Sequence, residues 1–266
     1  MSEARLSVAS WGAGDPVVAL HSGGMSSRQW RKLGERLAGS HRVLAPDFLG
    51  SGDNPPWPDD KPFHFSMDVE AVAALLGTLP RSAHLVGHSY GGLIALTLAR
   101  KYPERVRSVA VYDPVTFGVL HQAGDQEGLD DLSRAGSSPS FQDVSLRGGE
   151  AWMQVFVDYW NGEGSWRAMP APSREAFLRT GRKVSQEVHT LLLDLTAAEA
   201  YAGMSGPALL LHGEKSPLAA RRVVTLLARA MPTASLVGIP GAGHMGPLTH
   251  TSLVNERIAE HLARAP

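Results

Sequence analysis

The amino-acid sequence predicts an α/β protein whose mostly parallel β-sheet is covered by helices on both faces. Short apolar runs rich in Val, Leu and Ala alternate along the chain with stretches of helical spacing. Such alternation is typical of parallel sheets, whose strands are joined by crossover helices. It is interrupted once, from residue 115 to about residue 204, where loops rich in Gly and Pro separate helical stretches. We therefore expect a helical insertion between the strand predicted at residues 105–113 and the next one at residues 207–212.

Seven apolar runs are predicted to form the strands of this sheet. They lie at residues 5–10, 16–22, 41–47, 82–89, 105–113, 207–212 and 234–239. Helices are predicted between them at residues 27–39, 66–79, 90–102, 218–230 and 249–263. Ser66 is expected to cap its helix, with Asp68 and Glu70 in the first turns, where the helix dipole favours carboxylates.

Composition excludes several classes of function. The 266 residues are 43% hydrophobic and 19% charged, carry a formal net charge of −1 and include no cysteine. Disulfides, thiolate catalysis and zinc–thiolate sites are therefore excluded, and no basic surface is expected for nucleic acid or an anionic membrane. No secretory signal or membrane span is evident in the sequence. We expect a cytoplasmic monomer or homodimer that acts on a small molecule.

A candidate nucleophile lies between a predicted strand and a predicted helix. Residues 87–91 read Gly-His-Ser-Tyr-Gly and fit the pattern G-x-S-x-G in the strand–turn–helix context that gives this pattern its meaning. The tight turn leaves no room for side chains at Gly87 and Gly91. It presents the Ser89 hydroxyl at a helix N-terminus, where free N–H groups favour developing negative charge.

A serine nucleophile needs a base, and His244 is the candidate. It lies in the Gly-rich loop after the last predicted strand, and it follows Ser89 in the order expected for this kind of site. The same loop, residues 241–246, matches the dinucleotide pattern G-x-G-x-x-G. No further strand follows to complete a βαβ unit, so a dinucleotide site is not predicted.

With these elements in order, the chain resembles the α/β-hydrolase superfamily. The matching segments are residues 21–30, 47–52, 87–92, 212–217 and 241–244. The resemblance implies an eight-stranded sheet, with a core domain of residues 1–114 and 205–266 and a helical cap of residues 115–204. It also implies that the site uses no metal or cofactor. Because Ser89 stands at the nucleophile position, the branches of the superfamily that use aspartate there are disfavoured.

The loop after the second predicted strand is expected to form an oxyanion hole. In this architecture one N–H donor comes from that loop and the other from the residue after the nucleophile. We assign the amides of Gly23 and Tyr90, with Gly24 as the alternative in the loop. Glycine allows the backbone to approach a substrate oxygen closely.

The third member of the triad is not where the superfamily commonly has it. The matching segment reads Gly-Glu-Lys-Ser-Pro, with Ser216 in place of the usual aspartate. A second known location is the end of the strand beside the nucleophile strand, where this chain has Asp113. Neighbouring strands lie about 4.8 Å apart, so Asp113 should emerge beside Ser89. Asp113 is the preferred partner of His244; Glu214 is its rival, and Asp158 or Asp194 in the cap are further options.

Aromatic residues concentrate in residues 150–166 of the insertion. Trp152, Phe156 and Trp160 share one helical face, which either packs the cap onto the core or lines a pocket for a bulky apolar or aromatic substrate. Met25 and Phe117 are expected to add walls from the core side.

These residues predict a serine hydrolase for an ester, thioester or lactone. The alternative keeps the site but changes the chemistry, to carbon–carbon bond cleavage (hydrolytic or retro-Claisen) or to cofactor-free dioxygenation with His244 and Asp113 as the base. A non-catalytic ligand-binding protein is a third interpretation.

Overall fold

A computed structural model describes residues 6–204 and 206–265 of the chain. Seven strands form one sheet in the order β1-β3-β2-β4-β5-β6-β7. The strands are β1 (Val8–Trp11), β2 (Asp15–Leu20), β3 (His41–Pro46), β4 (Ala83–His88), β5 (Val106–Tyr112), β6 (Ala208–Gly213) and β7 (Ala234–Ile239). Only β1 is antiparallel to its neighbour; every other pair is parallel. The predicted mostly parallel α/β fold is confirmed.

Two sequence expectations need correction. The eighth strand, implied by the resemblance alone, is missing from the described residues, because a single strand, β1, precedes β2 there. Residue 5 of the first predicted strand lies outside the described residues. Ser66 does not cap its helix: it is the first residue of α2, and its hydroxyl hydrogen-bonds to His64.

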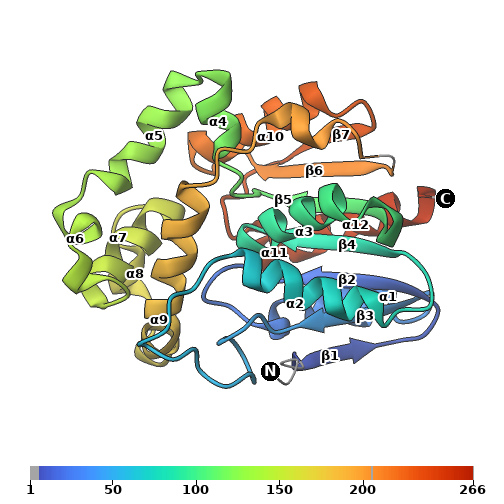
Figure 1. The fold of residues 1–266 in the computed structure, drawn as a ribbon, viewed down its shortest axis with the longest axis horizontal. Helices are drawn as coiled ribbons and strands as arrows, with labels where there is room; N and C mark the ends of the chain where they lie inside the picture. The colour runs from blue at the N-terminus through green and yellow to red at the C-terminus, as the bar shows by residue number, and fades with distance from the viewer. Residues whose placement is uncertain (1–5, 205, 266) are drawn as a thin grey trace.

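Helices cover both faces of the sheet (Figure 1). Apolar side chains of α2 (Ser66–Gly77), α3 (Tyr90–Lys101) and α10 (Leu218–Ala230) belong to one core cluster, and those of α1 (Arg31–Leu37) and α12 (Thr251–Arg264) to the other. Neighbouring residues of β2 alternate between the clusters, because successive side chains of a strand point to opposite faces. The sheet is therefore buried on both sides, as its continuous apolar strands require.

The segment between β5 and β6 contains helices and no strand in the residues described. Its helices are α4 (Gly118–Ala123), α5 (Gln126–Gly136), α6 (Pro139–Gln142), α7 (Glu150–Asn161), α8 (Ser165–Ala168) and α9 (Ala171–Leu192), with 3-10 turns η3 (Val144–Leu146) and η4 (Ala198–Tyr201). Figure 1 shows α5 to α9 gathered beyond the edge where the parallel strands end. The division into a core (1–114 and 205–266) and a cap (115–204) stays a prediction.

Three short elements complete the chain: η1 (Ser27–Trp30), η2 (Pro103–Arg105) and α11 (Gly246–Thr249). The carboxyl ends of β2, β4, β5 and β6 lie side by side, because these strands are parallel neighbours. Residues that follow them directly can therefore meet in one site. Within the described part of the chain, no helix is long and apolar enough to cross a bilayer.

Candidate active site

Ser89 occupies a strained turn between β4 and α3. Its φ is 54° and its ψ is −115°, and its amide donates a hydrogen bond to the Tyr112 carbonyl over 2.9 Å. A Cβ on Gly87 would lie 2.4 Å from the Gly91 carbonyl oxygen, and a Cβ on Gly91 would lie 2.2 Å from that of Leu20. The turn therefore requires glycine at both positions, as the sequence pattern predicted. A non-glycine residue at positive φ costs free energy and is typical of functional sites.

His244 and Asp113 are hydrogen-bonded to each other, and Asp113 directly follows the residue whose carbonyl accepts from the Ser89 amide. Asp113 directly follows β5, also at positive φ (44°), and is fully buried. His244 Nδ1 lies 3.0 Å from Asp113 Oδ2. The Tyr112 hydroxyl donates to the Gly243 carbonyl over 2.7 Å and so anchors the loop that carries His244. Two residues 131 positions apart in sequence are thus hydrogen-bonded in the fold.

The rival acid lies elsewhere. Glu214 is exposed, and its carboxylate accepts a hydrogen bond from the Gly241 amide over 3.3 Å. Ser216, which stands where the superfamily usually has an aspartate, donates its hydroxyl hydrogen bond to Asp113 Oδ2 over 2.6 Å. Asp158 accepts from the Trp166 amide, and Asp194 from Thr196. Of these four carboxylates, only Asp113 is hydrogen-bonded to His244.

Burial dominates the electrostatics of this pair. It lowers the pKa of the His244 imidazole, because the charged form loses its hydration. It also raises the pKa of Asp113, and the hydrogen bond from Ser216 opposes that rise. A neutral imidazole at neutral pH is free to accept a proton, which is what a general base requires.

The two predicted oxyanion donors border the same space as Ser89. Gly23 follows β2, and both Gly23 and Tyr90 line the cavity into which Ser89 opens. Tyr90 begins α3, where amides have no acceptor within the helix. The rival Gly24 has φ 72° and lines a second cavity that lacks Ser89.

A series of hydrogen bonds that the sequence did not indicate connects two of these loops. The Ser22 amide donates to Gln29 Oε1, and Gln29 Nε2 lies 3.0 Å from His88 Nδ1. His88 Nε2 then lies 2.9 Å from the His244 carbonyl oxygen. These hydrogen bonds tie the loop after β2 to the loop that carries His244. An amide at position 29 carries no sequence signal of such a role, because the partners lie 59 residues apart.

Two cavities meet at the site. The smaller, about 310 Å³, is mainly apolar and contains Ser89, Phe117 and Leu191 in its wall. The larger, about 540 Å³, contains His244 and Met25. Phe156 and Trp160 line both. The Trp160 ring stacks on the His244 imidazole with centroids 3.8 Å apart, so this residue of α7 contacts the candidate base directly.

One predicted pocket residue is not in the pocket. Trp152 lines neither cavity; it is 2% exposed and stacks between Phe141 and Phe156 in a separate apolar cluster of the insertion. It shares a helical face with Trp160 but lies two turns earlier, roughly 12 Å along the helix axis. For Trp152 the packing interpretation therefore holds, whereas Met25, Phe117, Phe156 and Trp160 reach the cavities.

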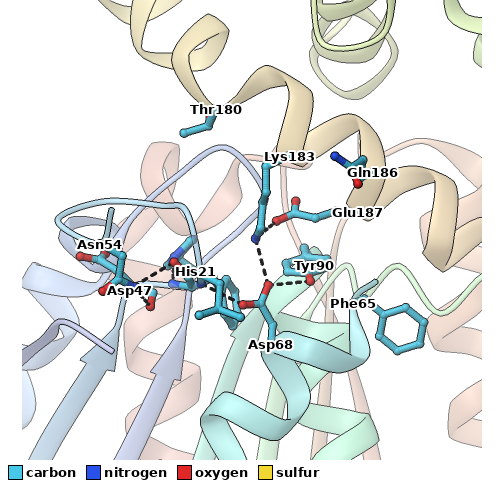
Figure 2. Close-up of polar contacts among 12 residues, drawn as sticks. His21, Asp47, Asn54, Phe65, Asp68, Tyr90, Thr180, Lys183, Gln186 and Glu187 are labelled. Atoms are coloured by element: carbon cyan, nitrogen blue, oxygen red, sulfur yellow. Dashed lines mark hydrogen bonds and ion pairs between the residues drawn. The ribbon is translucent and has the colours of Figure 1, made fainter. Parts of the chain in front are cut away.

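A buried ion cluster joins α9 to the core beside the site (Figure 2). Lys183 Nζ lies 2.9 Å from Asp68 Oδ2 of α2 and also contacts Glu187 one turn along α9. The Tyr90 hydroxyl donates to the same Asp68 oxygen over 2.8 Å. Lys183 also lies 4.5 Å from the centroid of the Phe63 ring. Asp68 thus pairs with a lysine, which the sequence did not indicate.

The chain matches the model of the Alpha/beta hydrolase family over residues 17–257 and belongs to that family. Its sheet order and its strained serine turn agree with this assignment.

Its relatives catalyse several reactions. The chain is 28% identical to a 2-hydroxymuconate semialdehyde hydrolase of Pseudomonas sp. strain CF600, over 96% of this chain and 89% of the relative. It is 29% identical to a pimeloyl-[acyl-carrier protein] methyl ester esterase of Chromobacterium violaceum, over 97% and 98%. The structure of an enol-lactonase from Burkholderia xenovorans LB400 is similar, with a TM-score of 0.73, 20% identity and coverage of 97% and 96%. By their names, these two relatives and this structural neighbour are hydrolases.

Proposed function

We propose that this protein is a serine hydrolase that cleaves an ester, thioester or lactone of a bulky apolar or aromatic small molecule. The observations that carry the proposal are the 3.0 Å contact of His244 with Asp113 and a serine held at positive φ in the wall of an apolar cavity. The esterase and the enol-lactonase among its relatives support this reaction class.

In the proposed reaction, Ser89 Oγ attacks the carbonyl carbon while His244 Nε2 accepts its proton. Asp113 holds the other ring nitrogen and stabilises the imidazolium that forms. The amides of Gly23 and Tyr90 donate to the oxyanion, and each such donor is typically worth roughly 10²–10³ in rate. Collapse of the intermediate releases the leaving group with the proton from His244. Water then hydrolyses the acyl-enzyme and regenerates Ser89.

The two cavities suggest how a substrate would lie. The smaller cavity borders Ser89 and would hold the acyl group. The larger cavity borders His244, from which the leaving group would take its proton. A helical cap formed by residues 115–204 would supply Phe156 and Trp160 as the wall between the two groups.

The test is covalent labelling of the nucleophile. A fluorophosphonate probe should add to Ser89, as detected by mass spectrometry of the intact protein and its peptides. The Ser89→Ala variant should remain unlabelled and lose ester hydrolysis. Absence of labelling on Ser89 in a folded protein would contradict the proposal.

The second candidate is hydrolytic carbon–carbon bond cleavage. It is favoured by the similarity to the 2-hydroxymuconate semialdehyde hydrolase over 96% of the chain. Assay of 2-hydroxymuconate semialdehyde against an ester substrate separates the two reactions. Base-only chemistry, including dioxygenation without a cofactor, should survive Ser89→Ala, whereas acyl-enzyme chemistry should not.

A further inference from the structure

One buried carboxyl group in the smaller cavity is not used by the proposed mechanism. Glu187 of α9 is 2% exposed and lines the cavity that contains Ser89. Its Oε1 pairs with Lys183. Its Oε2 makes no hydrogen bond with the described residues. This oxygen is not among the fully buried side-chain atoms without a partner, so it keeps some exposed surface. This oxygen is therefore available to a molecule in the cavity.

The free oxygen lies beside the proposed oxyanion hole. A Cβ built on Gly23 would be 3.0 Å from Glu187 Oε2. A substrate carbonyl that accepts from the Gly23 amide would therefore have its neighbouring carbon atoms close to this carboxyl. This contact between substrate and Glu187 would lie in the smaller cavity, since Gly23, Ser89 and Glu187 all line it.

The surroundings of Glu187 favour a hydrogen-bond donor as its partner. Much of the wall is hydrocarbon, for example Val115, Leu129 and Leu191. A buried acceptor without a partner costs free energy, and a charged one costs more. Lys183 does not reach Oε2, because its ammonium group is shared between Asp68 and Oε1.

We propose that Glu187 is a specificity-determining residue that binds a hydroxyl or N–H group on the acyl part of the substrate, next to the scissile carbonyl. This inference rests on the proposed function, since it takes the acyl group to lie in the cavity of Ser89. An acyl chain of hydrocarbon alone leaves Oε2 unpaired, and an acyl carboxylate meets a like charge. The preferred substrates are thus hydroxyacyl or aminoacyl derivatives with a bulky apolar remainder.

Burial raises the pKa of Glu187 to about 7, with Lys183 opposing the rise. Binding is therefore best measured at pH 8.5, where the carboxyl is ionised and accepts hydrogen bonds. Hydrogen bonds to charged groups are worth about tenfold or more in affinity.

The experiment measures binding without turnover. Calorimetry compares 2-hydroxy-3-phenylpropanamide with 3-phenylpropanamide, which differ only in the hydroxyl, in the Ser89→Ala protein. The hydroxyamide should bind about tenfold more tightly. Adding Glu187→Leu should reduce the ratio of the two affinities to about one while the affinity for the plain amide is retained.

Two further variants keep the test decisive. Glu187→Gln preserves the shape and a carbonyl acceptor and should give an intermediate ratio, which guards against misfolding of the Leu variant. Glu175→Gln changes an exposed glutamate of the same helix and should leave the ratio unchanged. The inference would be overturned if the Ser89→Ala protein bound both amides equally well or did not bind the hydroxyamide. A preference that persists in Glu187→Leu would also overturn it. Ester hydrolysis by the wild type is a separate readout, so failure of the proposed function would be recognised independently.

Discussion

At the scale of single residues, the site depends on where its carboxylate is attached. Asp113 follows β5, while Ser216 follows β6, and these two strands are paired. Their side chains converge so that the serine donates to the aspartate. A hydroxyl at position 216 favours the ionised form of Asp113 and so opposes the larger effect of burial, which raises the pKa of this carboxyl. Ser216, at the position where the resemblance led us to expect an acid, thus hydrogen-bonds to the proposed acid Asp113.

Asp113→Asn should lower kcat/KM for an ester substrate by up to about 10⁴-fold, because the amide cannot stabilise the imidazolium or hold its tautomer. Asparagine fits the left-handed backbone at this position, where φ is 44°, so the fold should persist. Steady-state kinetics with circular dichroism checks both points. The matched control is Glu214→Gln, which should keep full activity; equal rates for both variants would refute the assignment of Asp113.

At the scale of elements, α9 is attached to the core by polar contacts as well as by packing. Gln186 accepts a hydrogen bond from the Phe63 amide, and Thr190 accepts one from the Phe65 amide. Lys183 adds the buried ion pair with Asp68. Tyr90, whose amide is a proposed oxyanion donor, is held by the same carboxylate. Changes in α9 are therefore expected to reach the site.

Lys183→Met should lower the free energy of unfolding by about 3–5 kcal/mol, because it leaves two carboxyl groups buried without their cation. Chemical denaturation at pH 7 measures this loss. Arg182→Ala is the control on the neighbouring position: its ion pair with Asp59 spans 3.9 Å between exposed side chains. That variant should change stability by less than about 0.5 kcal/mol. A similar loss of unfolding free energy in both variants would show that the buried cluster contributes no more to stability than the exposed ion pair.

At the scale of the whole molecule, several buried or half-buried histidines make the fold sensitive to acid. Burial lowers the pKa of His21, His84 and His261 to about 4. It also lowers the pKa values of His88 and His244. These groups stay neutral in the folded state, whereas in the unfolded chain they are protonated below about pH 6.5. They contribute stability above that pH, and the contribution is lost as the pH falls toward 4.

Two carboxyl groups act in the opposite direction over the same range. Burial raises the pKa of Glu187 to about 7 and that of Asp113 to about 8. As the pH falls, these two carboxyl groups therefore take up protons in the folded state before they do so in the unfolded chain. Their contribution to stability is lost as the pH rises through these values. Five histidines outweigh two carboxyl groups between about pH 6.5 and 4.5, so the unfolded state takes up more protons there.

The free energy of unfolding should therefore decrease from pH 6.5 to pH 4.5. Urea denaturation at intervals of half a pH unit measures the slope. His84→Asn, which removes one buried imidazole hydrogen-bonded to Ser108, should reduce the slope by about one proton. His64→Gln at an exposed position should leave it unchanged. A stability that is flat across this range would contradict the account.

Much of the fold could be predicted from local pattern. The helix at 218–230 and the strand at 234–239 have the bounds expected from the sequence. Ser89 was recognisable because glycines flank it, at positions where the neighbouring backbone leaves no space for a side chain. The contribution of Gln29 and Lys183 was not recognisable, since a buried polar residue looks the same in sequence whether its partner is water or a distant carboxylate. Trp152 and Trp160 share a periodicity, but only the fold decides which end of α7 meets the cavity.

The sequence by itself determined the strand and helix order, the strained serine turn and the loop that carries His244, because each depends on neighbouring residues. The tertiary structure decided which carboxylate meets His244, which aromatic rings face the cavities, and that Glu187 presents an oxygen beside Gly23. The contacts of Asp113 with His244 and of Glu187 with Gly23 join residues more than 100 positions apart. Such contacts form because the parallel strands and the helical segment bring together parts of the chain that are distant in sequence. Local periodicity does not encode this arrangement.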